Sequence, residues 1–316
     1  MIAARQLSKR YPKTTAVEDL SFDVFPGAVT GFLGPNGSGK STTMRMVMGL
    51  DRPTSGRALV NGLPYGALKW PLREVGALLD AKAFHPGRSA FNHLLLLAQS
   101  NDIPRKRVGE VLETVGLSSV ANRRAGKFSL GMGQRLGIAS ALLGDPGVLL
   151  FDEPVNGLDP EGIRWVRHLL RNLAAEGRTV FVSSHLITEM ALTADRLVVI
   201  GRGRLIAETS VEEFTSRNAA SAVRVVTPFA SRLRPALDRA GASTAVEDDG
   251  AMTVSELQAR RIGDMAAEMS IPLHELTPVR ASLEDAFMEL TRDSVEFASP
   301  ESRQVLEAVS GPSSKE

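Results

Sequence analysis

The fold is decided by the stretch Gly34-Pro35-Asn36-Gly37-Ser38-Gly39-Lys40-Ser41. This stretch fits the pattern G-x-x-x-x-G-K-[ST], which forms a phosphate-binding loop when a strand precedes it and a helix follows it. The apolar residues 28–33 predict the strand, and the apolar positions among residues 44–48 predict the helix. A glycine-rich turn that fits the pattern by chance is the alternative, and the flanking strand and helix argue against it. The sequence therefore predicts a phosphate site between a buried strand and a helix N-terminus.

The residue types in this loop suit a nucleoside triphosphate bound with Mg²⁺. The glycines allow backbone N–H groups to surround phosphate oxygens, and the helix N-terminus adds partial positive charge. Lys40 is expected to reach the β- and γ-phosphates, and the Ser41 hydroxyl is expected to bind Mg²⁺. Thr42 follows at a position suited to the α-phosphate.

A pair of carboxylates ends a second predicted strand, residues 148–151. Asp152 lies where an enzyme with such a loop needs an acid to hold Mg²⁺. Glu153 comes next and is expected to lie beside the γ-phosphate and to polarise the attacking water. Two solvated acids at a strand end are the alternative, which the phosphate loop disfavours.

A second candidate anion site precedes a predicted helix at residues 136–143. Ser129 occupies a helix N-cap position, and Gly131 and Gly133 permit close approach of the backbone. An ordinary capped helix start explains the same residues without a ligand.

Short apolar strands alternate with helices along the first two thirds of the chain. Strands are predicted within residues 1–33, 148–151, 179–182 and 197–206, and helices within 88–143 and 163–175. Continuous apolar strands that alternate with helices favour an α/β fold with a parallel sheet covered on both faces.

The last third of the chain predicts a smaller α+β domain in the β-α-β-β-α-β order of ferredoxin-like modules. Its strands are expected at 222–226, 243–246, 252–254 and 271–276, and its helices at 231–240 and 256–269. We therefore expect a nucleotide-binding domain over 1–215, a linker over 216–221 and an accessory domain over 222–296. A last amphipathic helix is expected from Ser282, with Asp285 in its capping box, and a disordered tail over 297–316.

The composition excludes several classes of protein. The chain has 316 residues, with 37 basic and 36 acidic residues and a formal net charge of +1. A protein held to nucleic acid by phosphate contacts usually carries a basic excess, so we expect no nucleic-acid partner. The absence of cysteine from the sequence excludes a disulfide framework and thiol catalysis. The apolar runs are short and the first residues lack an apolar core, so we expect neither a membrane-spanning segment nor a secretory signal.

Together these motifs resemble the ATP-binding subunits of ABC transporters over residues 1 to about 215. Residues 34–42 match their Walker A motif, and residues 149–153 match their Walker B motif. Residues 128–132 occupy the place of the signature L-S-G-G-Q, and residues 157–160 resemble the D-loop. Carried over position by position, the resemblance implies further nucleotide contacts at Tyr11, Ser129, Gly131 and Asp159. It also implies that His185 is the switch histidine. The family places an adenine-stacking aromatic at Tyr11, for which packing alone is the alternative.

Two motifs depart from the family pattern. The signature has Leu130 in place of its first glycine and Met132 in place of its glutamine, while Ser129 and Gly131 are kept. Asp80 stands where the family has the glutamine of the Q-loop. A carboxylate oxygen is also a hard Mg²⁺ ligand, so Asp80 is expected to contact the metal, with a role in loop structure only as the alternative. These variants resemble the bacitracin- and daunorubicin-resistance branch of bacterial exporters.

The resemblance implies a P-loop ATPase domain with a parallel-sheet core, an antiparallel β-subdomain and a helical subdomain. It implies that two chains, identical or related, enclose two ATP–Mg²⁺ and drive a separate integral membrane permease at the cytoplasmic face of the membrane. Export of a drug, an antibiotic or a lipid-like compound is expected. In this arrangement Glu153 activates water. The γ-phosphate is stabilised by His185 and Lys40, and Mg²⁺ is held by Asp152 and Ser41.

Two other classes of protein are alternatives to a transport ATPase. A soluble ABC ATPase that works on nucleic acid or ribosomes generally has two ATPase cassettes or a long coiled-coil insertion, and this chain shows neither. A regulatory module that has lost catalysis is disfavoured by the presence of Glu153 and His185.

Overall fold

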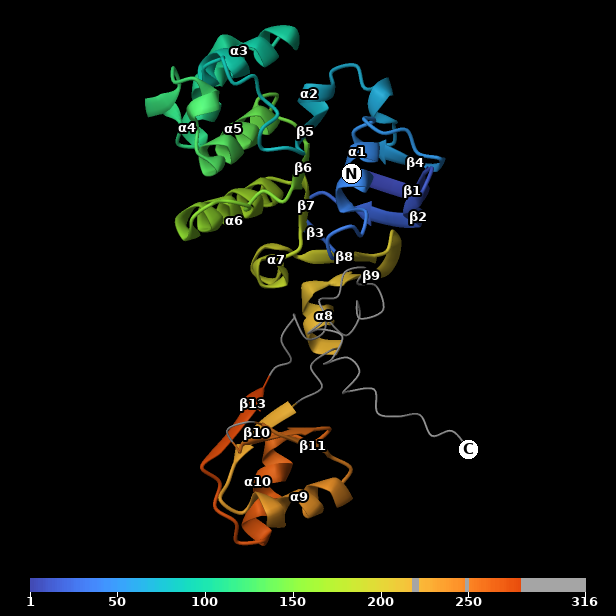
Figure 1. The fold of residues 1–316 in the computed structure, drawn as a ribbon, viewed down its shortest axis with the longest axis vertical. Coiled ribbons are helices and arrows are strands. Elements are labelled where there is room, and N and C mark those ends of the chain that lie inside the picture. The colour runs from blue at the N-terminus through green and yellow to red at the C-terminus, as the bar shows by residue number, and fades with distance from the viewer. Residues whose placement is uncertain (218–221, 248–249, 280–316) are drawn as a thin grey trace. The chain divides into compact units, whose positions relative to one another are not determined.

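A computed structural model of the chain describes residues 1–217, 222–247 and 250–279. These residues form two compact units, the first over residues 1–209 and the second from Ser210 onward, and Figure 1 labels most of the elements of both. The expected helix from Ser282 with Asp285, the expected tail and residues 218–221 of the expected linker lie outside the described residues.

A six-stranded sheet with the order β5-β6-β7-β3-β8-β9 forms the centre of the first unit. Its strands are β3 (Val29–Leu33), β5 (Val75–Leu78), β6 (Val148–Asp152), β7 (Thr179–Ser184), β8 (Arg196–Gly201) and β9 (Arg204–Ser210). The pairs from β5 through β8 are parallel. Every residue of β3 and β7 is buried, as expected for strands covered on both faces. The predicted parallel α/β core is confirmed.

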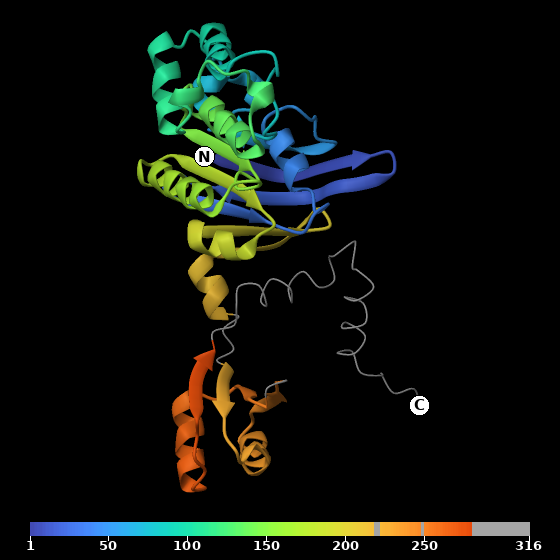
Figure 2. The same cartoon turned by 60° about the vertical axis from the view of Figure 1, so that its left-hand side comes forward.

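Two layers cover this sheet. On one side lie α6 (Pro160–Ala175) and α7 (Ile187–Thr193), and on the other lie α1 (Lys40–Val47) and a second sheet (Figure 1). The second sheet is antiparallel, with the order β2-β1-β4, and consists of β1 (Ile2–Tyr11), β2 (Thr14–Val24) and β4 (Ser55–Val60). β1 and β2 form a long hairpin, blue in Figure 2. The expected antiparallel subdomain is therefore present.

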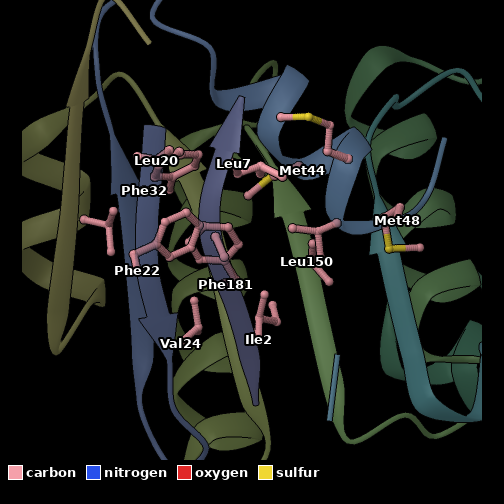
Figure 3. Packing of buried hydrophobic residues seen from close by; sticks show 14 of the residues in the cluster. Ile2, Leu7, Leu20, Phe22, Val24, Phe32, Met44, Met48, Leu150 and Phe181 are labelled. Carbon is pink, nitrogen blue, oxygen red and sulfur yellow. The ribbon is translucent and has the colours of Figure 1, made fainter. Parts of the chain in front are cut away.

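Three aromatic rings join the two sheets. Phe22 of β2 packs against Phe32 of β3 and Phe181 of β7, with ring centroids 5.0 to 5.6 Å apart (Figure 3). All three side chains are at most 2% exposed. Burial of three large rings at one point ties the strand that precedes the phosphate loop to the antiparallel layer.

A group of helices follows β5 and forms the expected helical subdomain. It consists of α3 (Ala90–Ser100), α4 (Arg105–Thr114), α5 (Leu130–Leu142) and the 3₁₀ helices η2 (Ser118–Val120) and η3 (Ala125–Lys127). The short helices η1 (Tyr65–Ala67) and α2 (Pro71–Glu74) precede β5. α5 packs closely on β5 where Gly76 faces the backbone of Ala141. The approach is so close that a Cβ atom added to Gly76 would overlap that backbone. This contact fixes α5 beside the central sheet.

One buried histidine in these helices is expected to make the stability of the protein depend on pH. His93 of α3 is 8% exposed, and its Nδ1 is buried without a hydrogen-bond partner among the described residues. Burial, and next the charge of Arg88, lower the pKa of His93. The folded state therefore binds this proton less readily than the unfolded chain, so stability is full above about pH 6.5 and falls as the pH drops below that value.

His93→Gln removes the titrating group. The free energy of unfolding of this variant is therefore expected to fall by about 1 kcal/mol less than that of the unaltered protein when the pH is lowered. Denaturant unfolding at about pH 7.5 and about pH 5.5 measures the difference. His168→Gln, at an exposed position of α6, is the matched control and should keep the pH dependence of the unaltered protein. Equal pH dependence in both variants would contradict the role of His93.

The second unit has the ferredoxin-like order that the sequence predicts. Its strands are β10 (Ala222–Val226), β11 (Ser243–Val246), β12 (Met252–Ser255) and β13 (Glu275–Val279), and its helices are α9 (Ala230–Arg239) and α10 (Ala259–Glu268). The sheet order is β11-β12-β10-β13, and neighbouring strands are antiparallel. Both helices contribute to its core, with Leu233 and Leu237 from α9 and Ile262 from α10.

Two boundaries differ from the sequence prediction. The composition predicts a linker from residue 216, but α8 (Val211–Arg217) extends past that point. The Ser210 hydroxyl accepts a hydrogen bond from the Glu213 N–H at 3.0 Å and so caps the helix start. The last strand begins at Glu275 instead of residue 271. Pro272 has no N–H to pair in a sheet, and its carbonyl accepts from the Thr227 hydroxyl instead.

Candidate nucleotide site

The phosphate loop connects β3 to α1 and is shaped by glycine. Gly39 is the N-cap residue of α1 and has a φ of +100°, a conformation that favours glycine. A Cβ atom added there would meet the carbonyl oxygen of Ala16. A Cβ added to Gly34 would overlap the hydroxyl of Ser38. Glycine at these two positions therefore lets the loop pack against the Ala16 carbonyl and the Ser38 hydroxyl.

Lys40 is held inside this loop. Its side chain is 6% exposed, and its Nζ donates to the carbonyl oxygens of Gly34 at 2.7 Å and Pro35 at 3.2 Å. Glu153 Oε1 lies 4.0 Å from the same nitrogen. The pKa of Lys40 is lowered from its ordinary value, because the effect of burial exceeds the opposing effect of the charges of Glu153 and then Asp152. The structure thus brings Lys40 together with both carboxylates of the second motif.

The carboxylates are placed by the pairing of β6 with β7. Asp152 is the last residue of β6 and lies opposite Ser183 of β7. The Ser183 hydroxyl is fully buried, donates to Asp152 Oδ1 and accepts from the Glu153 N–H at 3.0 Å. One serine therefore orients the side chain of Asp152 and the backbone of Glu153.

Glu153 and His185 form a second pair at this edge of the sheet. His185 follows β7 directly, and its Nδ1 lies 3.0 Å from Glu153 Oε2. The His185 side chain is 38% exposed and that of Glu153 is 19% exposed. A carboxylate within hydrogen-bond reach of an accessible imidazole can accept a proton from water and be reoriented by the ring.

The signature and D-loop residues serve a local role within the chain. The Ser129 hydroxyl accepts from the Met132 N–H at 3.2 Å and caps α5, and Asp159 accepts from the Gly162 N–H at 2.8 Å and caps α6. A Cβ atom on Gly131 would touch Leu158, which lies in the D-loop. Among the described residues no hydrogen bond joins Ser129, Gly131 or Asp159 to the phosphate loop, so the two motifs contact each other and not the loop of the same chain.

Tyr11 and Asp80 lie at the ends of strands away from these contacts. Tyr11 ends β1, is 45% exposed and has the Lys9 ammonium 5.2 Å from its ring centroid. Asp80 is exposed, and its Oδ1 accepts from the Lys82 N–H at 2.8 Å. The exposed ring is available for stacking, and the Lys82 N–H takes one of the two Asp80 carboxylate oxygens.

Two residues near the site are absent from the sequence prediction. Ser183 follows directly after the apolar run that ends at residue 182. The sequence signal that could have indicated Ser183 is a polar residue that continues a buried strand. Gln134 is 2% exposed in α5, and its Nε2 donates to the backbone oxygen of Glu153 at 2.9 Å. A polar residue in an apolar helix stretch is the corresponding signal.

The residues present fit a nucleotide phosphate with Mg²⁺. The Ser38 hydroxyl is buried in the loop without a hydrogen-bond partner among the described residues. Buried polar groups are usually hydrogen-bonded, so this hydroxyl suits a polar ligand in the loop. Asp152 and the exposed Ser41 supply oxygen atoms, the donors that Mg²⁺ prefers. Among the described residues no three His, Cys, Asp or Glu form a metal cluster. Mg²⁺ at a nucleotide needs no such cluster, because phosphates and water complete its shell.

Fold and site together define a P-loop nucleotide-hydrolysing ATPase. The family model described as "ABC transporter" matches residues 17–156, and a model described as a domain of unknown function matches residues 221–284. The bacitracin transport ATP-binding protein BcrA of Bacillus licheniformis is 41% identical over 221 residues, which cover 69% of this chain and 72% of that protein. The uncharacterized ABC transporter ATP-binding protein YhcH of Bacillus subtilis strain 168 is 34% identical over 94% of this chain and 97% of its own length.

A solved structure supports the same assignment. The dimeric, post-hydrolysis state of an ATP-binding cassette bound to ADP and Pi matches with a TM-score of 0.62 and 26% identity, over 67% of this chain and 99% of that one. The chain belongs to the ATP-binding subunits of ABC transporters, and it is an ATPase. The family expected from the motifs is confirmed. In the part of the chain that the structure describes, no helix has the length and apolarity to span a bilayer.

Proposed function

We propose that this chain energises a bacterial exporter whose membrane-spanning permease is a separate polypeptide. The observation that carries the proposal is the convergence of Lys40, Glu153 and His185 beside a glycine-shaped phosphate loop. Such a site can hydrolyse ATP, and the similarity to a bacitracin transport protein favours an antibiotic or a related drug or lipid-like compound as cargo. The chain would then act at the cytoplasmic face of the membrane.

In the proposed reaction the chain surrounds the triphosphate of ATP. Lys40 exchanges its bonds to the loop carbonyls for bonds to the β- and γ-phosphates, and Thr42 holds the α-phosphate. The proposed Mg²⁺ contacts are Ser41, Asp152 and, at the family's Q-loop position, Asp80. The bound metal would supply positive charge that stabilises the negative charge developing on the phosphate. The remaining loop contacts are Gly34, Pro35, Asn36, Gly37, Ser38 and Gly39, and Tyr11 stacks on the adenine.

Glu153 is the proposed general base for hydrolysis. A water oxygen attacks the γ-phosphorus, its proton passes to the Glu153 carboxylate, and the bond between phosphorus and the departing ADP oxygen breaks. The contact between His185 Nδ1 and Glu153 Oε2 at 3.0 Å supports the proposal that His185 orients the base and stabilises the γ-phosphate as charge develops. Lys40, close to the opposite carboxylate oxygen, supplies a fixed positive charge.

Two chains are needed in this proposal, as a homodimer or with a related subunit. Ser129 lies exposed at the start of α5, and its hydroxyl and Gly131 are not joined to the phosphate loop of their own chain. A helix N-terminus presented to solvent can receive the γ-phosphate held by a second chain. Asp159 lies beside this surface at the start of α6 and is the third proposed contact to the partner's nucleotide.

The permease is proposed to dock near Asp80 to Arg88. A cavity of about 460 Å³ is lined there by residues of the loop and of the neighbouring helices, among them Asp80, Ala83, Phe84 and Leu97. The domain over 222–296 is proposed as an accessory domain of the same subunit, with residues 1–215 as the ATP-binding domain and 216–221 as the linker between them.

A pull-down of the tagged chain from detergent-solubilised membranes tests the transport function. The proposal expects a polytopic membrane protein in near-equal amount, absent from the untagged control. Recovery of ribosomal or DNA-bound proteins without an integral membrane protein would overturn transport and favour a soluble ABC ATPase instead. The recovered permease is also the subunit in which the cargo site should be sought.

A further inference from the structure

A buried glutamine connects α5, the helix that begins at the signature motif, to the backbone of the proposed general base Glu153. Gln134 lies in α5, five residues after the capping residue Ser129, and is 2% exposed. Its Nε2 donates to the backbone carbonyl of Glu153 at 2.9 Å. A buried amide is costly unless it is hydrogen-bonded, so the pairing with Glu153 accounts for a polar residue at this place in the helix.

The backbone of Glu153 needs such support. Its φ is +49°, in the left-handed region that a residue with a Cβ atom adopts only when its surroundings hold it there. The N–H donates to the Ser183 hydroxyl at 3.0 Å, and the carbonyl accepts from Gln134 and from the Asn156 N–H at 3.2 Å. Side chains from two separate elements, β7 and α5, therefore clamp both sides of this residue.

The clamp acts on the carboxylate because the backbone sets the direction of the side chain. In the held conformation Glu153 Oε2 lies 3.0 Å from His185 Nδ1, and Oε1 lies 4.0 Å from Lys40 Nζ. Relaxation of φ to a negative value would swing the Cβ atom and withdraw the carboxylate from both groups. A general base displaced in this way cannot reach its water.

We propose that Gln134 is a positioning residue for ATP hydrolysis, which holds the proposed general base Glu153 in its left-handed conformation from the signature helix. This inference rests on the proposed role of Glu153. Among the described residues the Gln134 side chain bonds to the Glu153 carbonyl and not to the phosphate loop or His185, so we expect Gln134 to affect the turnover rate and not nucleotide affinity.

Two variants of the full chain separate hydrogen bonding from packing. Gln134→Met keeps an unbranched side chain of similar length without the donor, and Gln134→Glu keeps the shape but replaces the amide by a carboxyl group. Burial favours the protonated carboxyl, which donates to the Glu153 carbonyl, whereas the ionised form repels it. Gln99→Met, at an exposed position of α3, is the matched control.

The measurements are steady-state ATPase kinetics and equilibrium binding of a fluorescent ATP analogue. We expect kcat of Gln134→Met to fall by about tenfold or more, with nucleotide affinity within about twofold of the unaltered protein. The activity of Gln134→Glu relative to the unaltered protein should rise as the pH is lowered from about 8 to about 6. A packing role alone would leave that ratio constant across the range.

Two results would overturn the inference. One is a kcat for Gln134→Met within about twofold of the unaltered protein. The other is a pH-independent activity ratio for Gln134→Glu. Glu153→Gln, assayed alongside, keeps the two proposals distinguishable. If it is inactive while Gln134→Met is fully active, only the role of Gln134 fails; if it remains active, the proposed role of Glu153 fails whatever Gln134 does.

Discussion

Glu153→Gln is expected to abolish ATP turnover and to preserve ATP binding. The amide has the shape of the carboxylate but cannot accept the proton of the attacking water. The Lys40 ammonium and the loop glycines, which are proposed to hold the phosphates, are left in place. Loss of a general base lowers rates by about 10²- to 10⁴-fold, so phosphate release should fall by at least about 10²-fold.

Steady-state phosphate release and equilibrium nucleotide binding measure the two parts of this prediction. Glu113→Gln, at an exposed position of α4 outside the site, is the matched acid-to-amide control and should turn over ATP as the unaltered protein does. If Glu153→Gln hydrolyses ATP at a rate close to that of its control, Glu153 is not the base. Weakened binding with normal turnover at saturating ATP would give the carboxylate a role in affinity instead.

Lys40→Ala is expected to lose nucleotide affinity as well as turnover. The Lys40 ammonium is buried among the loop carbonyls and two carboxylates, and it is placed to meet phosphate oxygens when ATP enters. Charge-assisted hydrogen bonds to phosphate are stronger than neutral ones, so the dissociation constant should rise by about tenfold to a hundredfold. Removal of the lysine also leaves the Glu153 and Asp152 carboxylates without the positive charge they share.

Titration with a fluorescent ATP analogue measures this loss. Lys69→Ala, an exposed lysine of the same unit, is the control for the general loss of one positive charge. Unchanged affinity in Lys40→Ala would contradict the assignment of the phosphate loop. A thermal unfolding curve without nucleotide checks that the variant is folded before its affinity is compared.

The sequence predicts the fold and the phosphate loop well because both depend on local patterns. The buried strands are continuous apolar runs, and the loop between β3 and α1 is a single motif whose glycines suit its tight backbone. Glu153 and His185 can be proposed in the same way, since each directly follows a buried strand. Parallel strands bring such ends to one edge of a sheet.

The supporting residues of the site depend on contacts that no local pattern contains. Ser183 reaches Asp152 across 31 residues of sequence, and Gln134 reaches Glu153 across 19. Their importance follows from the strand pairing and from the packing of α5, which are properties of the folded chain. For Asp80 the family position predicts a metal contact, which stays a prediction, and the structure adds that its Oδ1 accepts from the Lys82 N–H.

The boundary of the last strand shows how a single residue overrides an apolar pattern. Residues 271–276 contain Ile271 and Leu273, which favour a strand by composition alone. Pro272 between them prevents regular pairing, and the strand begins at Glu275. Ile271 is nevertheless buried in the core of the second unit, so the apolar pattern is correct about burial while it is wrong about the strand.

The order of strands in the central sheet has a consequence for the way the protein is made. β7 lies between β3 and β6, so the phosphate loop after Leu33 cannot be joined to its carboxylates until residues 179–184 have been synthesised and inserted. Closing so long a segment costs entropy before the strand pairing compensates for it, which makes such parallel insertions late events in folding. The loop is thus translated early and completed late. A ligand that binds only the folded state stabilises it by mass action, so ATP held by the loop and the carboxylates together would favour the chain in which this sheet is complete.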